Sequence, residues 1–407
     1  MRYRFTTLLS AALILVATPD SRASAQDIPV LSADARISLI TVLPGQDVYS
    51  TFGHSALRVV DPRLGIDESY NYGTFDFGSS PDSIAGFIGR FTYGDLNYRL
   101  TIQRGSQMVA WYWTELQRAT IEQTLALSSE ERQAMYQHLR VNALPENRYY
   151  QYDFFFDNCA TRLLGAVEVA VGSRLSFGME APDRSLRELL DPYLPGIPWT
   201  DFGMNLGLGL LADREATARE ATFLPELLMN HLATGRIDRG GEPTPLVLRT
   251  DTLTGGAGIS WEPEAAAPWP AIALWILFAA GALLTVADLR SGRPRRRIVD
   301  TLFFGTLGIG GLVVAFLWFV SLHTVTDGNL NLAWALPTHV IVAVAIARDV
   351  GRRWLGTYMA VTALLALIVL VGFPFWPQRL PTAVIPLLLL IVVRAVSLVR
   401  VQLNTSA

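Results

Sequence analysis

The sequence contains no lysine, so all 33 of its basic residues are arginine, and a lysine Schiff base or a lysine general base is excluded. Charge of either sign is scarce: charged residues make up 17% of the chain, whereas soluble domains contain about 25%. With 51% hydrophobic residues and a mean hydropathy of +0.30, neither a simple soluble enzyme nor a disordered chain is expected. The net charge of −3 also lacks the basic excess typical of nucleic-acid-binding proteins, so no nucleic-acid partner is expected.

Cysteine is nearly absent as well. Cys159 is the only one, which excludes a disulfide within the chain. One cysteine and scattered histidines cannot supply the four ligands of a structural zinc site, so we expect no metal and no other cofactor. A lone cysteine in an exported protein is either a buried, inert thiol or a reactive one.

The N-terminus has the pattern of a secretory signal. Arg2 and Arg4 precede a short apolar run, residues 5–17, and Ala23-Ser24-Ala25 forms an A-x-A cleavage site. Residues 1–25 are therefore predicted to be a signal peptide, and an uncleaved N-terminal membrane anchor is the alternative.

Long apolar runs are confined to the C-terminal third of the chain. Residues 26–265 have the mixed composition of a soluble domain, a segment rich in Gly, Ala and Pro follows, and residues 266–407 are predicted to form a transmembrane domain. Arg394, inside the last run, is expected to snorkel to the membrane surface. The five helices expected in the membrane are 268–287, 301–322, 330–347, 355–373 and 381–399.

Arginine is distributed unevenly between the loops of this domain. Residues 288–300 contain five arginines and residues 348–354 contain three, whereas residues 323–329 contain none. The positive-inside rule places the arginine-rich loops in the cytoplasm. Residues 26–265 then face outward, as the signal peptide independently requires.

The outward-facing part is predicted to be an α+β domain. Strands are indicated over residues 37–43, 55–60 and 68–77, with a turn between the last two at residues 61–65. Ser128 and Glu131 form a capping box that opens a helix ending before Pro145. A second helix is expected to begin at residues 157–159 and to end near Gly172.

Cys159 therefore stands at the start of a helix, where backbone N–H groups and the helix dipole should lower its pKa. This is where a papain-like enzyme carries its nucleophile, and a thiol nucleophile needs a base. Of the five histidines, His54 is the best candidate, because it begins a strand directly after Gly53. The alternative for both residues is a structural role in the core.

Four segments carry a family resemblance. They are Phe52–Val59 (FGHSALRV), Tyr70–Phe77 (YNYGTFDF), Tyr152–Arg162 (YDFFFDNCATR) and Ser321–Leu332 (SLHTVTDGNLNL). The first three resemble the periplasmic domain of bacterial Lnb-type lipoprotein N-acyltransferases, and the fourth resembles the membrane domain of the same family. The resemblance implies a circularly permuted papain-like or NlpC-like thiol domain followed by a five-helix transmembrane bundle.

The resemblance also implies residue roles. Cys159 becomes the nucleophile and His54 the general base and acid. A third residue that orients the imidazole is expected on the strand after His54, where Asn71 is preferred because the hairpin brings residues 71–74 opposite His54, and Asp76 is the alternative.

Further candidates have structural alternatives. Tyr152 can donate to an oxyanion or belong to the core, Asn158 can donate to the oxyanion or cap the helix, and Arg162 can bind a lipid phosphate or form an ion pair. His323 and Asn331 are candidates for binding the lipid or the lipoprotein, and a solvated connecting loop is the alternative.

The resemblance implies an acyltransferase that moves a fatty acyl chain, through a thioester on Cys159, to the N-terminal amine of a lipoprotein. The partners are then a membrane phospholipid, a diacylated lipoprotein, or both. Two other hypotheses remain open at this point. One is a membrane-anchored periplasmic cysteine peptidase or amidase that acts on cell-wall peptides, and the other is a non-catalytic membrane scaffold.

Overall fold

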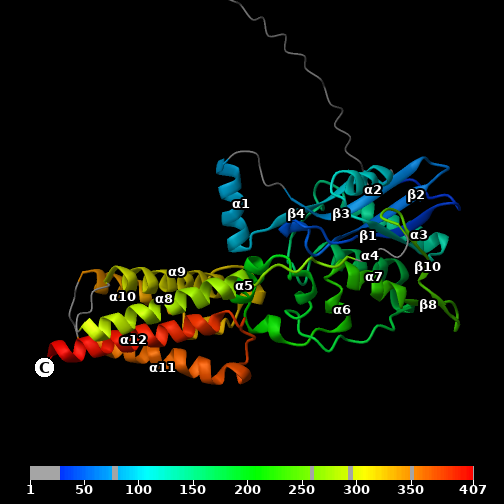
Figure 1. Cartoon of the computed structure of the whole chain (residues 1–407). Coiled ribbons are helices and arrows are strands. Elements are labelled where there is room, and N and C mark those ends of the chain that lie inside the picture. Colours follow the sequence, from blue (N-terminus) through cyan, green and yellow to red (C-terminus); the bar gives the residue numbers. More distant parts are fainter. Residues whose placement is uncertain (1–27, 76–80, 257–260, 292–296, 349–352, 407) are drawn as a thin grey trace, which may run out of the picture.

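The computed structural model describes residues 28–75, 81–256, 261–291, 297–348 and 353–406, so the expected signal peptide and Asp76 lie outside the described residues. A domain built on a β-sheet forms one end of the molecule, and a bundle of long helices forms the other (Figure 1). The first long apolar helix begins at Trp269, and the expected boundary at residues 265–266 stays a prediction.

The sheet has seven strands, and neighbouring strands are antiparallel. In spatial order they are β10 (Val247–Thr252), β5 (Thr120–Leu125), β1 (Arg36–Val42), β2 (His54–Asp61), β3 (Ile66–Thr74), β4 (Asn97–Arg104) and β6 (Tyr149–Gln151). The three strands expected from the sequence are β1, β2 and β3. The hairpin between β2 and β3 turns over residues 62–65, because Asp61 pairs with Ile66. This register brings the end of β3 toward His54.

Helices cover both faces of the sheet. The two faces of β1 alternate with period two: Ile37 and Leu39 belong to the core on one side, and Ile40 and Val42 to the core on the other. The first side is covered by α3 (Ser129–Asn142), α4 (Cys159–Val171) and α7 (Pro225–Ala233), and the second by α2 (Gly105–Thr114). The expected capping box is present, because Glu131 N donates to Ser128 Oγ and Ser128 N donates to the Glu131 carboxylate.

The chain between α4 and the bundle is built from short elements around a separate apolar cluster. The helices α5 (Pro198–Gly207) and α6 (Ala218–Ala221) lie around this cluster. A small sheet of β7 (Leu175–Ser176), β8 (Arg236–Asp238) and β9 (Pro243–Pro245) packs instead on the main core through Ile237. In Figure 1, α5 lies at the end of the bundle that faces the sheet domain.

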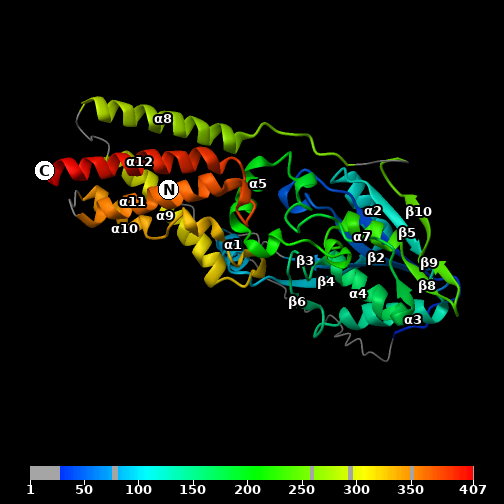
Figure 2. The ribbon, with the colours of Figure 1, turned by 90° about the horizontal axis from the view of Figure 1, so that it is seen from below.

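The C-terminal helices run side by side in both Figure 1 and Figure 2. They are α8 (Trp269–Ser291), α9 (Arg297–Phe319), α10 (His339–Ala347), α11 (Arg353–Gly372) and α12 (Val384–Ser406). Among the described residues, three helical stretches are long and apolar enough to cross a membrane: Trp269–Arg290, Arg297–Phe319 and Trp354–Phe375. A count of five spanning helices stays a prediction.

The expected helix over residues 330–347 was wrong in its first half. Residues 330–333 form a short 3₁₀ turn, and α10 begins only at His339 and has nine residues. Pro337 disfavours helical backbone in the residue before it, which separates the two segments. The irregular chain packs closely on α9, since a Cβ atom on Gly311 would collide with the carbonyl oxygen of Ala335. Glycine is therefore needed there.

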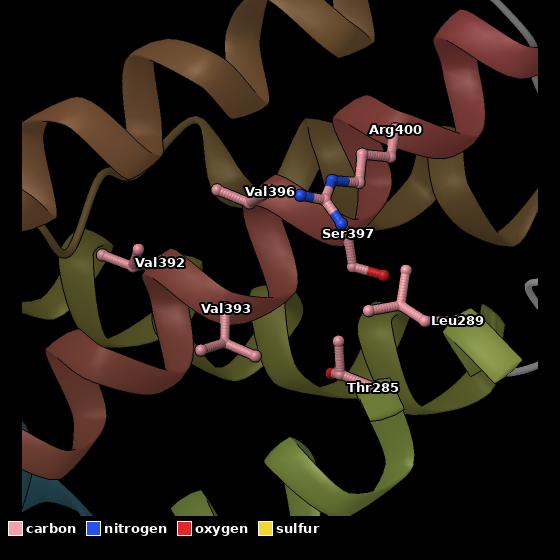
Figure 3. A pocket seen from close by; sticks show the side chains of 7 residues that line it. All are labelled: Thr285, Leu289, Val392, Val393, Val396, Ser397 and Arg400. Carbon is pink, nitrogen blue, oxygen red and sulfur yellow. The ribbon is translucent and has the colours of Figure 1, made fainter. Parts of the chain in front are cut away.

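The expected position of Arg394 also needs correction. Its guanidinium is buried in the bundle and binds both carboxylate oxygens of Asp300, at 2.7 and 2.8 Å, and the hydroxyl of Thr285 at 2.7 Å. Asp288 lies 3.4 Å away. The carboxylate of Asp300 stabilises the buried guanidinium within the bundle. The side chain therefore does not extend to the membrane surface. Thr285 also lines a pocket between α8 and α12, which Arg400 closes on the other side (Figure 3).

Candidate active site

Cys159 lies beside the start of the hairpin β2–β3, where α4 packs across these two strands. His54 is the first residue of β2 and Cys159 is the first residue of α4. The backbone N–H of Ser55, next to His54, points to the sulfur of Cys159 and favours its thiolate form. The packing of α4 on the hairpin thus brings the starts of β2 and α4, which are 105 positions apart in the sequence, to the same region of the fold.

Asn71 holds the imidazole of His54. The Nε2 atom of His54 lies 3.2 Å from Oδ1 of Asn71, and Nδ2 of Asn71 donates to the carbonyl oxygen of Ser69 at 3.3 Å. The second bond fixes the orientation of the amide, so its oxygen faces the ring and must accept a hydrogen from Nε2. Nδ1 is then the ring atom with a free lone pair, and it is available to act as a base.

Asn158 is the N-cap of α4. Its Oδ1 accepts from the N–H groups of Ala160 and Thr161 at 2.9 and 3.0 Å, and its Nδ2 donates to the carbonyls of Phe154 and Phe223. Thr161 completes the capping box by accepting from Asn158 N. All groups of this side chain are engaged, so the structure gives Asn158 the capping role and leaves it no hydrogen for an oxyanion.

The ionisation of the pair differs from the expectation that the helix start lowers the Cys159 pKa. Burial raises the pKa of the Cys159 thiol, and this effect outweighs the backbone N–H groups of Ser55 and Ala160 and the nearby charge of Arg118. Burial also lowers the pKa of His54 to about 4, against the opposing effect of its bond with Asn71. At neutral pH the site therefore holds a thiol and a neutral imidazole that can accept its proton.

Three tyrosine side chains border the thiol: Tyr112, Tyr150 and Tyr152. The sequence analysis named only Tyr152. A Cβ atom on Gly73 would lie 3.8 Å from Cys159 Cβ, 3.9 Å from the Tyr150 hydroxyl oxygen and 4.0 Å from Cε2 of Tyr152. Gly73 has φ +89°, in a bulge where the pairing of β3 with β4 shifts register. On the α2 side, the ring of Tyr112 lies 6.1 Å from that of His54, and burial raises the pKa of Tyr112 to about 12.

Tyr150 is a further candidate oxyanion donor beside Tyr152. Its hydroxyl is buried and has no hydrogen-bond partner among the residues that the structure describes, which is rare for a polar group in a folded protein. Burial raises the pKa of Tyr150 strongly, so the hydroxyl keeps its proton. Tyr152 instead stacks on Tyr98, with ring centroids 4.4 Å apart. The sequence contains tyrosines at positions 149, 150 and 152. No local feature of the sequence indicates which of their hydroxyls is left without a hydrogen-bond partner.

Arg118 is a second residue that the sequence analysis missed. It is 5% exposed, its Nε donates to the carbonyl of Leu43 at 2.8 Å, and its guanidinium lies over the ring of Tyr112 at 5.2 Å. Its Nη2 atom has no hydrogen-bond partner. The positive charge lowers the pKa values of both Cys159 and His54. Nothing in the sequence near residue 118 indicates this role, because the contact joins segments that are far apart in the sequence.

Arg162 is committed to other contacts. It binds both carboxylate oxygens of Asp157, at 2.6 and 2.7 Å, and its guanidinium lies 3.7 Å from the ring centroid of Tyr150. The structural ion pair, rather than a site for a lipid phosphate, is therefore what the structure shows.

His323 and Asn331 make hydrogen bonds to other parts of the chain. Asn331 is fully buried at the top of the bundle, where its amide donates to the carbonyl of Leu206 and accepts from the Trp334 indole. It holds the loop against α5, which corrects its proposed place in the lipid site. The Nε2 of His323 lies 2.7 Å from the carbonyl oxygen of Phe91, at the end of α1 (Pro81–Tyr93).

Among the residues that the structure describes, no group of three or more His, Cys, Asp and Glu side chains could hold a metal ion. What the site offers is a nucleophile, a base held by an amide, a buried cation and an unpartnered hydroxyl. This set can carry out acyl transfer through a covalent intermediate.

Comparison with known families decides where the chain belongs. A model of the Lnb N-terminal periplasmic domain matches residues 30–191, and a model of the Lnb transmembrane domain matches residues 262–406. The chain belongs to the Lnb family. It is a membrane protein with a periplasmic N-terminal domain, as expected from the arginine distribution. No curated protein and no solved structure matched the chain. His54, Asn71 and Cys159 all fall within the periplasmic match of this Lnb-family protein.

Proposed function

We propose that this Lnb-family protein is a cysteine-dependent lipoprotein N-acyltransferase of the bacterial inner membrane. The observation that carries the proposal is the position of one thiol, Cys159, at the backbone N–H of Ser55, the residue after the imidazole that Asn71 holds, in a chain that continues into membrane helices. An acyl ester lies at the bilayer surface, so a catalytic domain fixed there meets its substrate in two dimensions. We also propose that residues 26–265 form a permuted papain-like domain and that residues 266–407 form a membrane domain.

In the first half of the reaction, Cys159 Sγ attacks the carbonyl carbon of a lipid ester while Nδ1 of His54 takes the thiol proton. The negative charge on the carbonyl oxygen is met by the Tyr150 hydroxyl and the backbone N–H of Cys159, the first residue of α4. When the tetrahedral intermediate collapses, the C–O bond breaks and His54 gives its proton to the departing alkoxide. The products are an alcohol and a thioester on Cys159.

In the second half, the α-amine of the lipoprotein's N-terminal cysteine attacks the thioester. His54 takes a proton from the amine and returns it to the departing sulfur, so the C–N bond forms as the C–S bond breaks. The amide produced is more stable than the ester consumed, and no nucleotide is needed. The ester belongs to a membrane phospholipid or to the diacylglyceryl group of a lipoprotein.

The test is acylation of a purified diacylated lipoprotein in proteoliposomes that contain phospholipid with isotope-labelled acyl chains. Mass spectrometry of the lipoprotein N-terminus should show an amide-linked acyl chain, and the label identifies the donor. Cys159→Ser and His54→Gln should abolish the product. His138→Gln is the matched control, because His138 lies in the same domain on α3 and contacts Asn142 rather than the thiol.

A free N-terminal amine after incubation with the wild-type protein would overturn the proposal. So would activity of Cys159→Ser within a few-fold of wild type. Hydrolysis of cell-wall peptides that depends on Cys159, without lipoprotein acylation, would establish the peptidase alternative instead.

A further inference from the structure

The helix α1 carries an apolar stripe that the described protein leaves uncovered. Ile84, Ile88 and Phe91, spaced four and three residues apart on one face, are 43%, 57% and 50% exposed, and Tyr93 is 42% exposed. A helix in a water-soluble domain turns such a stripe toward the core. Contiguous exposed apolar groups of this kind mark a surface that contacts a partner or a membrane.

The end of α1 is fixed to the point where α9 leaves the membrane. The backbone N–H of Leu322 donates to the carbonyl of Tyr93 at 2.7 Å, and His323 bonds to the carbonyl of Phe91. Phe319, the last residue of α9, and Val320 and Leu322 just after it are 67%, 52% and 52% exposed, at the end of a helix that is long and apolar enough to cross a membrane. The apolar stripe of α1 is therefore continuous with a surface that contacts lipid.

The direction of α1 agrees with this position. In Figure 1 it runs across the direction of the bundle helices, and in Figure 2 it is seen nearly end-on at the same end of the bundle. If the bundle helices cross the bilayer, α1 lies in the plane of the membrane surface. Amphipathic helices of peripheral proteins take this orientation, with their apolar face in the acyl-chain boundary.

A row of aromatic rings connects α1 to the thiol. Ring centroids are separated by 6.0 Å from Phe91 to Phe87, 5.5 Å from Phe87 to Phe75, 4.8 Å from Phe75 to Tyr98 and 4.4 Å from Tyr98 to Tyr152. Tyr152 borders Cys159 at Gly73. Phe75, Phe87 and Tyr98 also line a small pocket between α1 and β4.

We propose that α1 lies in the outer surface of the membrane with Ile84, Ile88 and Phe91 among the lipids, and that the aromatic row leads a lipid acyl chain from there to Cys159. Flat rings suit a hydrocarbon chain, because the faces of their rings offer apolar surface. The route to Cys159 rests on the proposed acyl transfer, whereas the position of α1 does not.

The experiment uses the full chain in phosphatidylcholine vesicles. Cys159→Ser removes the only cysteine, so a single new cysteine can carry a fluorophore that reports on its environment. Ile88→Cys tests α1. Leu248→Cys is the matched control, because Leu248 is 70% exposed on β10, at the opposite edge of the sheet domain from the bundle (Figure 1).

The label at Ile88 should show a blue-shifted emission, quenching by nitroxide-labelled lipid and little quenching by iodide in the water. The label at Leu248 should show the reverse. Iodide quenching at Ile88 equal to that at Leu248 would overturn the position of α1.

A photo-crosslinker tests the aromatic row in the same inactive background, so the result does not depend on acyl transfer. Phe87→benzoylphenylalanine should form an adduct with radiolabelled phosphatidylcholine. Phe177→benzoylphenylalanine is the control, since Phe177 is also half-buried but stacks on His231, with ring centroids 3.9 Å apart. Equal lipid labelling at both positions, or none at Phe87, would overturn the route.

Discussion

Nε2 of His54 and Oδ1 of Asn71 lie 3.2 Å apart, and the bond from Asn71 to Ser69 fixes which atom of the amide faces the ring. An amide in this position sets the tautomer of the imidazole without adding a negative charge beside it. The pKa of His54 is therefore free to fall to about 4 as burial disfavours the imidazolium. The base is neutral over the whole physiological range.

The first prediction concerns the acid limb of the pH profile. Asn71→Asp places a carboxylate against the ring, which favours the imidazolium and raises the pKa of His54 above about 4. Only the neutral imidazole can take the thiol proton, so activity should be lost at a higher pH than in the wild type as pH falls. Profiles of kcat/KM against pH check this, and an unchanged acid limb would contradict the contact.

Asn71→Ala is the companion variant. It removes the hydrogen bond without adding charge, so the imidazole loses its fixed orientation. We expect kcat/KM at neutral pH to fall by about 10- to 100-fold, since small displacements of catalytic groups cost this much. Thermal unfolding should change little by comparison, which distinguishes loss of orientation from loss of fold.

The second prediction concerns the reactivity of Cys159. Arg118 carries a buried positive charge that lowers the thiol pKa, so Arg118→Met should raise that pKa further. The thiolate fraction at any given pH then falls, and alkylation by iodoacetamide should shift to higher pH. Arg118→Lys keeps the charge and serves as the control. An unchanged rate–pH curve in a folded Arg118→Met protein would show that the charge does not act on the sulfur.

The third prediction concerns the stability of the bundle. Arg394→Leu leaves Asp300 buried without its partner, which should cost about 3–5 kcal/mol of stability. Arg394→Leu combined with Asp300→Leu should recover much of the loss, because both charges are then removed. Arg400→Leu is the control, since Arg400 is exposed on the same helix, and unfolding in detergent is the measurement. Equal melting of Arg394→Leu and Arg400→Leu would contradict the network.

The fourth prediction concerns topology. A reporter fused after Arg297 should report the cytoplasm, and one fused after Asp327 should report the periplasm, because arginine-rich loops stay inside. The two positions lie at opposite ends of α9. The same compartment at both positions would show that α9 does not span the membrane.

Local sequence determined much of the scaffold. Alternation of apolar residues predicted β1, β2 and β3, and the capping residues Ser128 and Asn158 marked the starts of α3 and α4. These signals are carried by residues within a few positions of one another, so a single sequence contains them. Cys159 at a helix start and His54 at a strand start were visible for the same reason. The arginine count of the loops predicted the side on which the domain lies, because it depends on composition alone.

Tertiary packing decided which groups meet. The sequence favoured Asn71 over Asp76 as the partner of His54, and the fold places Asn71 Oδ1 3.2 Å from the ring, whereas Asp76 lies outside the described residues. Packing also raised the pKa of Cys159, which the helix start alone would lower, because burial depends on everything that surrounds the sulfur.

The roles of the remaining polar side chains follow from the same physics. Asn331 and Arg394 were assigned to lipid and to the membrane surface from composition, and both are buried against partners from distant segments. Arg118 and Tyr150 carry no local signal, since their importance comes from atoms left without a partner beside the thiol. A buried polar group takes the nearest partner in space, and the sequence specifies that partner only through the completed fold.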